Sequence, residues 1–84
     1  MRRGPVSWEF VKSRCVRHGD CLVWMGARTS LGYGHLRDHD QNKYVHRLAY
    51  EFNVGSIPDG LLVDHACRNP SCCEPSHLRL ATAK

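Results

Sequence analysis

The sequence predicts a small α+β domain that is stabilised by a zinc ion. The chain has 84 residues, and a chain of this size usually buries so little apolar surface that a staple such as a metal or disulfides is expected. Cys67, Cys72 and His77 follow one another at C-x4-C-x4-H spacing, so one loop brings two thiolates and an imidazole together. Zinc is the natural ion for these ligands. Short β-rich segments and segments of helical spacing make up the rest, and we expect a single domain over 1–84.

Residues 1–20 predict an N-terminal helix and a lead-in segment. Val6, Phe10 and Val11 fall on one helical face, and Pro5 suits the start of a helix. Gly19 and the aspartate after it end this region.

Residues 21–60 predict a β-meander followed by a helix. Three strands are expected, at 21–25, 32–37 and 43–45, with a turn over 26–31. Leu48, Ala49 and Phe52 then have helical spacing within 46–52, and the helix should end near Asn53 and Gly55. The Ile-Pro-Asp-Gly run at 57–60 is a turn signal.

Residues 61–84 predict a two-stranded core that encloses the zinc loop. The apolar run Leu61-Leu62-Val63 begins a strand over 61–65, and the apolar and polar residues alternate over 78–81, so these two segments can pair antiparallel. Asp64 and His65 then lie at the tip of the first strand, where a histidine could act as a general base.

Charge and cysteine content narrow the class of protein. The net charge of +4 favours nucleic acid as a partner, although scattered arginines would also serve solubility. Five cysteines form an odd set, and no secretory leader is recognisable, so a reducing cytoplasm with metal-bound thiolates fits better than a secreted disulfide scaffold. No apolar stretch approaches the length that spans a bilayer, so we expect a soluble protein with no membrane partner.

Several motifs occur together in the order of a known family. They are Cys21-Leu22-Val23-Trp24-Met25-Gly26, Gly32-Tyr33-Gly34, Val45-His46-Arg47-Leu48-Ala49-Tyr50-Glu51, Ile57-Pro58-Asp59-Gly60, Val63-Asp64-His65, Cys67-Arg68-Asn69, Cys72, Pro75 and His77-Leu78. With these motifs, residues 20–82 resemble HNH endonucleases of the phage and intron-homing type. That family belongs to the His-Me finger, or ββα-metal, superfamily. The resemblance implies a DNA-cleaving enzyme in a phage or bacterial setting.

The resemblance also implies roles for individual residues. His65 would be the general base, and Asp64 would hold a catalytic divalent ion, magnesium or manganese, against the scissile phosphate. Arg47 resembles a family arginine near the phosphate. His46 begins a helix close to the predicted site, where it could position a phosphate or water. An upstream cysteine completes the structural zinc set in zinc-containing relatives; Cys21 takes that place here, with Cys15 as the alternative.

Two positions depart from the family pattern. Glu74 replaces the asparagine that usually precedes the proline, which changes the local charge. Family members continue into a helix whose early asparagine binds the catalytic metal, whereas this sequence stops at Lys84, so the final helix is expected to be truncated.

Two functions are favoured by the sequence, and a protein-binding zinc module is a third and weaker alternative. The first is a metal-dependent HNH endonuclease that nicks DNA or cleaves it with loose specificity. Site-specific cleavage would need extra modules or a homodimer. The alternative is a non-catalytic, zinc-bound nucleic-acid-binding module. In either case a small zinc domain should keep its aromatic side chains in the core; these are Trp8, Trp24, Tyr33, Tyr44, Tyr50 and Phe52.

Overall fold

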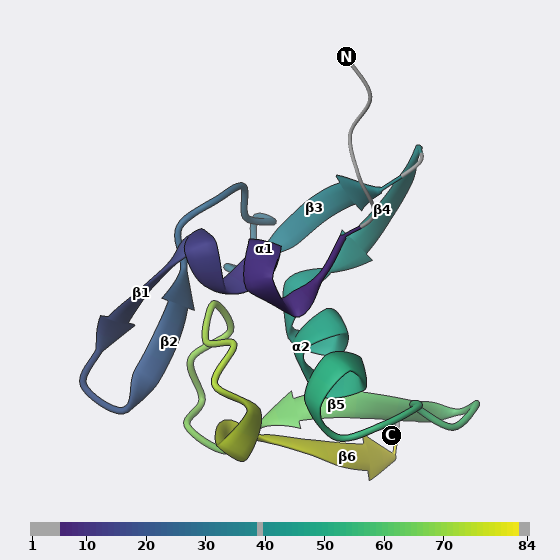
Figure 1. The fold of residues 1–84 in the computed structure, drawn as a ribbon. Coiled ribbons are helices and arrows are strands. Elements are labelled where there is room, and N and C mark those ends of the chain that lie inside the picture. The colour runs from purple at the N-terminus through teal and green to yellow at the C-terminus, as the bar shows by residue number, and fades with distance from the viewer. Residues whose placement is uncertain (1–5, 39, 83–84) are drawn as a thin grey trace.

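The computed structural model describes residues 6–38 and 40–82. Within these residues, six strands pair into three antiparallel hairpins. The elements in chain order are α1 (Trp8–Ser13), β1 (Cys15–His18), β2 (Cys21–Trp24), β3 (His35–Asp38), β4 (Gln41–Tyr44), α2 (Val45–Asn53), β5 (Leu61–His65), the 3-10 helix η1 (Pro75–His77) and β6 (Leu78–Thr82). In Figure 1, α2 lies between the β3–β4 and β5–β6 hairpins. The small α+β fold class is therefore confirmed.

The strand pairing differs from the predicted meander. β2 pairs with β1, a strand that the sequence analysis did not predict, and β3 pairs only with β4. Gly19, with a φ of 63°, lies in the turn of the first hairpin and does not end a lead-in segment. β1 could not be predicted because three of its four residues are exposed. Its sequence therefore lacks the alternation of apolar and polar residues that marks a half-buried strand.

The predicted strand over 32–37 begins only at His35. The preceding residues curve around the indole of Trp24, which is buried. A Cβ atom on Gly34 would lie 2.7 Å from Cδ1 of Trp24, so the backbone approaches the ring as closely as glycine permits. Gly34 forms a single antiparallel bridge with Arg28, so this segment packs against Trp24 and pairs with the loop before it instead of extending β3.

Both predicted helices are present. α1 begins at Trp8 because the Ser7 hydroxyl accepts a hydrogen bond from the Phe10 amide at 3.2 Å. Pro5, the expected start, lies outside the described residues. Val11 is fully buried, whereas Phe10 is only partly buried. α2 matches its predicted position, and its last residue, Asn53, donates from its side chain to the Ala49 carbonyl.

The core forms where α2 meets α1, β2 and the β5–β6 hairpin. Its buried members are Val11, Trp24, Val45, Ala49, Tyr50, Val63, Cys73 and Leu78. The expectation that all aromatic side chains lie inside is wrong for Tyr44 and Phe52, which are exposed. Tyr44 precedes the first turn of α2, and Phe52 lies on the outer side of that helix. Among the described residues, no helix is long and apolar enough to cross a membrane.

The β5–β6 hairpin confirms the predicted two-stranded core. β5 has the predicted bounds, and its last residue, His65, lies opposite Leu78 in the register. The loop between the strands folds back onto β2, beside which it runs in Figure 1. The Trp24 amide donates to the Ser71 carbonyl, and the Cys73 amide donates to the Leu22 carbonyl. The predicted zinc loop is thus attached to the first hairpin.

Candidate metal centre and histidine pair

Cys21, Cys67, Cys72 and His77 form one compact cluster. Their ligand atoms all lie within 4.8 Å of one another. Nδ1 of His77 is 3.7 Å from Sγ of Cys21 and 3.5 Å from Sγ of Cys72. A tetrahedral zinc ion holds sulfur and nitrogen ligands about 3.5 Å apart, given bonds of about 2.3 and 2.0 Å. The four side chains therefore have the identity and spacing to hold zinc.

Three separate parts of the fold bring these ligands together. Cys21 begins β2, Cys67 follows β5, and His77 ends η1 just before β6. Cys72 is placed by the bridge that pairs it with Val23 of β2. Zinc bound here would tie the first hairpin to the last one. Such a cross-link would add to the stability of a domain whose core is small.

The other two cysteines lie outside this cluster. Cys15 donates from its thiol to the Val11 carbonyl at 3.2 Å, so the structure assigns the fourth position to Cys21 and not to Cys15. Cys73 is buried. Its hydrogen bond with Cys15 and its burial raise the pKa of the Cys73 thiol, and the group remains a neutral packed side chain.

Glu74, the departure from the family pattern, has a partner in the missed strand β1. Its carboxylate accepts a hydrogen bond from the Arg17 guanidinium at 2.7 Å. This bond holds the pKa of Glu74 below its usual range. The carboxylate therefore links the metal loop to the first hairpin.

His65 and His46 form a buried pair beside the metal centre. Each is only 7% exposed, and their ring centroids lie 4.7 Å apart. Nε2 of His65 lies 3.0 Å from the carbonyl oxygen of Cys72. A carbonyl can only accept, so this bond requires the proton on Nε2 and leaves Nδ1 as the proton acceptor. Nδ1 of His46 is buried and has no hydrogen-bond partner among the described residues.

Burial keeps both imidazoles neutral. For His46, burial followed by the charges of His65 and Arg47 lowers the pKa to about 4, against an opposing contribution from the Val63 backbone. For His65, burial lowers the pKa, and the bond to Cys72 and the charge of Asp64 only partly offset this shift. A neutral imidazole is the form that can accept a proton.

Asp64 lies on the opposite face of β5 from His65. Residues alternate between faces along a strand, and here Val63 and His65 are buried while Asp64 is half exposed. One carboxylate oxygen accepts from the His65 amide at 2.9 Å, and the other is 3.3 Å from the Arg79 guanidinium. The guanidinium of Arg79 therefore lies where a divalent ion bound to Asp64 would lie.

Arg47 and His46 line one pocket at the start of α2. The structure thus brings together three of the four predicted catalytic residues, with Asp64 turned toward Arg79. It also adds Tyr33, whose ring centroid is 5.4 Å from that of His46 and 6.0 Å from that of His65. The Gly-Tyr-Gly motif marks this position in the sequence, but the sequence analysis placed Tyr33 in the core and did not predict its contact with the histidines.

The sequence profile of the HNH endonuclease family matches residues 43–84, which is half of the chain and includes α2, β5, the metal loop and β6. The chain belongs to the HNH endonuclease family. His65 and three of the four cluster ligands of this HNH chain fall inside the match, and Cys21 lies outside it.

The HNH chain is also similar to proteins of two phages. Protein 7.7 of Escherichia phage T7 is 40% identical over 65 residues, which cover 77% of this chain and 50% of that protein. Protein 2.8 of the same phage is 37% identical over 71 residues, which cover 82% of this chain and 48% of that protein. The uncharacterized gene 5.3 protein of Enterobacteria phage T3 is 47% identical over 66 residues, which cover 70% of this chain and 65% of that protein. The chain thus spans about half the length of the T7 relatives. No solved structure matches it.

Proposed function

We propose that this HNH chain is a metal-dependent endonuclease that hydrolyses phosphodiester bonds in DNA, by nicking or loosely specific cleavage. The fixed orientation of His65 carries the proposal. Its Nε2–H is held by the Cys72 carbonyl, so Nδ1 is free of that bond and can accept a proton. Both residues lie in the segment that matches the family.

His65 is the proposed general base. Its Nδ1 takes a proton from water as the water oxygen attacks phosphorus. The bond from phosphorus to the leaving oxygen then breaks, and that oxygen takes a proton from solvent. Arg47 would stabilise the negative charge that builds up on the phosphoryl oxygens, and His46 would position the phosphate or the attacking water.

Asp64 is the proposed ligand of a magnesium or manganese ion. Such ions are commonly held by one or two carboxylates together with substrate phosphates and water, so one half-exposed carboxylate suits them. When bound, the ion would neutralise charge at the scissile phosphate. Arg79 would have to move aside, because its guanidinium lies 3.3 Å from the carboxylate. Zinc at the Cys3His cluster would have a structural role.

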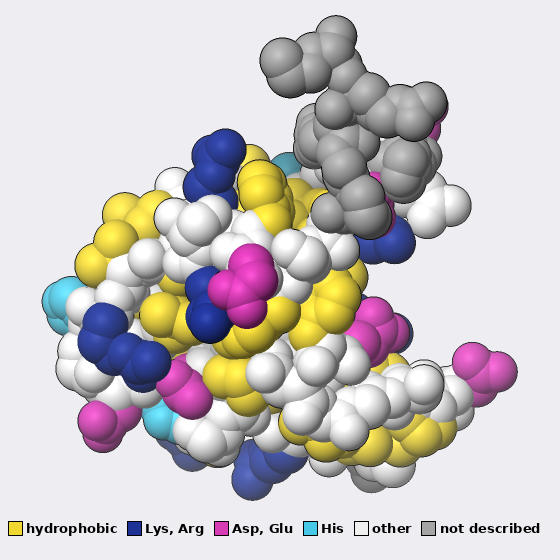
Figure 2. Space-filling view, viewed as in Figure 1, with side chains coloured by type: hydrophobic (Ala, Val, Ile, Leu, Met, Phe, Trp, Pro, Cys, Tyr) yellow, Lys and Arg dark blue, Asp and Glu magenta, His cyan; other side chains and the backbone are white. Residues whose placement is uncertain are grey.

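DNA is the proposed partner, and an intracellular setting is proposed from the similarity to phage proteins. The net charge of +4 suits a phosphate backbone. Lys and Arg side chains are spread over the face shown in Figure 2 and do not gather in one patch. Positive charges that are spread in this way would contact the phosphate backbone of DNA. Such contacts support loose specificity and predict binding that weakens as the salt concentration increases.

The test is cleavage of supercoiled plasmid by zinc-loaded protein with added magnesium or manganese. Wild-type protein should produce nicked or linear DNA. His65→Ala should lower the rate about 100-fold or more while zinc content and circular dichroism stay unchanged. His18→Ala is the matched control, because His18 is exposed on β1 and is not one of the cluster ligands; since it lies opposite Cys21 in the strand register, the zinc content of this variant is measured as well. Full activity in His65→Ala would remove the proposed mechanism.

A second function is favoured by two observations at the same site. His65 is only 7% exposed, and Asp64 is already paired with Arg79. Both features suit a zinc-bound nucleic-acid-binding module that does not cut. In the plasmid assay, this function predicts a shift of the DNA band without nicked or linear product.

A further inference from the structure

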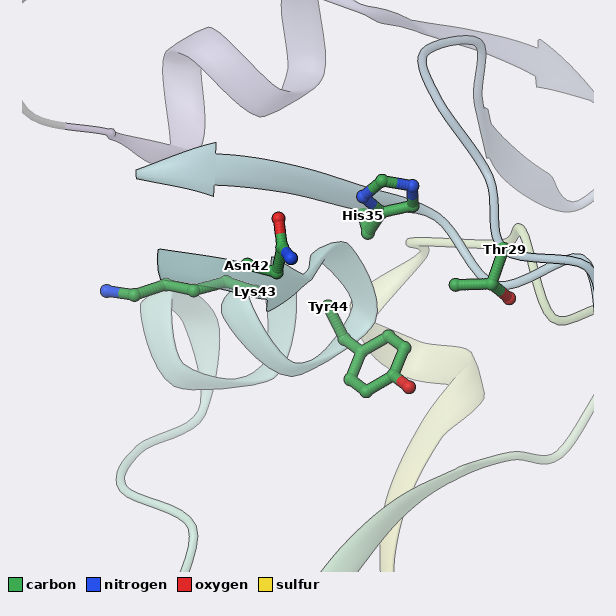
Figure 3. A pocket seen from close by; sticks show the side chains of 5 residues that line it. All are labelled: Thr29, His35, Asn42, Lys43 and Tyr44. Carbon is green, nitrogen blue, oxygen red and sulfur yellow. The ribbon is translucent and has the colours of Figure 1, made fainter. Parts of the chain in front are cut away.

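A pocket with unusual lining lies beside the histidine pair. Its volume is about 410 Å³, and the loop before β3, the start of α2 and the β5 strand all contribute to its walls. The lining residues that matter here are Leu31, Tyr33, Tyr44, His46, Arg47 and Leu62. We call this hollow the tyrosine pocket. Thr29 and Tyr44 also line a neighbouring hollow of about the same volume, where they lie with His35 and Asn42 while Lys43 extends away (Figure 3).

Large apolar side chains around the tyrosine pocket are left in solvent. Leu31 is 76% exposed, Leu62 is 49% exposed and Tyr44 is 45% exposed. Exposed apolar side chains that gather at one pocket favour a ligand with apolar surface of its own. The rings of Tyr33, Tyr44 and His46 form a mutually contacting cluster, with centroid distances of 5.9 Å from Tyr33 to Tyr44, 5.4 Å from Tyr33 to His46 and 5.6 Å from Tyr44 to His46. Held aromatic rings of this kind suit stacking of a flat ligand.

The polar groups of the pocket favour a ligand with a hydrogen-bonding edge and a negative charge. Nδ1 of His46 is buried without a partner among the described residues, which is a costly state that a ligand donor or acceptor would relieve. Arg47 supplies a positive charge next to it. The first turn of α2 carries no acidic residue, and Tyr44 makes no side-chain capping bond there, so the positive end of the helix is open to an anion.

We infer that the tyrosine pocket binds one unstacked nucleobase of a DNA substrate, with the phosphate of the same nucleotide at Arg47. A nucleotide combines the required properties: a flat aromatic ring, a polar edge for His46 and an anionic phosphate. The inference rests on the proposed function and names its substrate class. A base that is stacked within a duplex cannot enter a pocket, so the favoured substrate is single-stranded or locally unpaired DNA. Because the ring centroids of Tyr33 and His65 lie 6.0 Å apart, the bound nucleobase would lie beside the proposed general base, His65.

The test measures binding without cleavage. Zinc-loaded protein is titrated, in buffer without magnesium or manganese, into a fluorescently labelled single-stranded oligonucleotide and into the matching duplex. The wild-type protein should bind the single strand more tightly. Tyr44→Ala should weaken single-strand binding about 10-fold and leave duplex binding unchanged, since one stacking ring is lost. Phe52→Ala is the matched control, because it removes another exposed aromatic ring, on the outer side of α2.

A second measurement reports directly on the base. A 2-aminopurine in the single strand should change its fluorescence on binding to wild-type protein, and the change should shrink with Tyr44→Ala and persist with Phe52→Ala. Equal affinity for single strand and duplex, or equal loss of both with Tyr44→Ala, would overturn the inference. These outcomes are separable from the proposed function: plasmid cleavage without single-strand preference removes only the pocket, and single-strand preference without plasmid cleavage removes only the catalysis.

Discussion

Replacing Cys72 by alanine should unfold the protein, whereas the same change at the neighbouring Cys73 should not. Both side chains are almost fully buried, so the loss of packing is similar. Only Cys72 belongs to the metal cluster. The comparison therefore isolates the contribution of zinc from that of the thiol volume.

The expected magnitudes differ widely. A structural zinc site contributes about 10 kcal/mol or more of apparent binding free energy, while a small domain has a total stability of about 5–15 kcal/mol. Loss of the site should thus leave little or no folded protein. Cys73→Ala removes one buried sulfur and should cost about 1 kcal/mol, which lowers the Tm of a domain of this size by about 4–8 °C.

Zinc content and thermal melting followed by circular dichroism measure both variants. Wild-type protein and Cys73→Ala should retain zinc and melt cooperatively, and a chelator should abolish the transition in both. Cys72→Ala should show neither bound zinc nor a transition. The reasoning is refuted if Cys72→Ala melts at the wild-type temperature, because the cluster would then contribute nothing to the fold.

Three other predictions concern packing, charge and pH. Gly34→Ala should cost about 1–3 kcal/mol in thermal melts, since the new Cβ would lie 2.7 Å from the Trp24 ring; an unchanged Tm would contradict the close packing. Arg79→Gln should lower the magnesium concentration needed for half-maximal cleavage, because it frees the carboxylate of Asp64, and should change stability by less than about 1 kcal/mol, since both groups are exposed. The pKa of His46 is about 4 in the folded protein and about 6.5 in the unfolded chain. As pH drops below about 6.5, the unfolded chain takes up a proton that the folded protein does not. The free energy of unfolding should therefore fall, and this fall should continue down to about pH 4. The Tm of His46→Leu should therefore fall less between pH 7 and pH 5 than the Tm of wild type, and parallel falls would exclude His46 as the cause.

Local sequence patterns were enough to predict several elements of the fold. β5 and α2 follow from an apolar run and from helical spacing, and the pairing of β5 with β6 follows from two apolar segments that flank one loop. Three zinc ligands were recognisable from their spacing in that loop, and the fourth from the family resemblance. In each case, a few consecutive residues carry the necessary physical signal.

Features that depend on contacts between distant parts of the chain became visible in the three-dimensional structure and could not be predicted from local patterns. β1 has almost no buried face, so its pairing with β2 becomes visible only through the backbone register. The opposite orientations of Asp64 and His65 follow from strand alternation combined with the position of the core, and Arg79 reaches Asp64 from the neighbouring strand. Tyr33 reaches the histidines because its loop folds over the start of α2. Spacing along the chain fixes which residues are near in sequence, whereas burial and pairing fix which side chains meet in space.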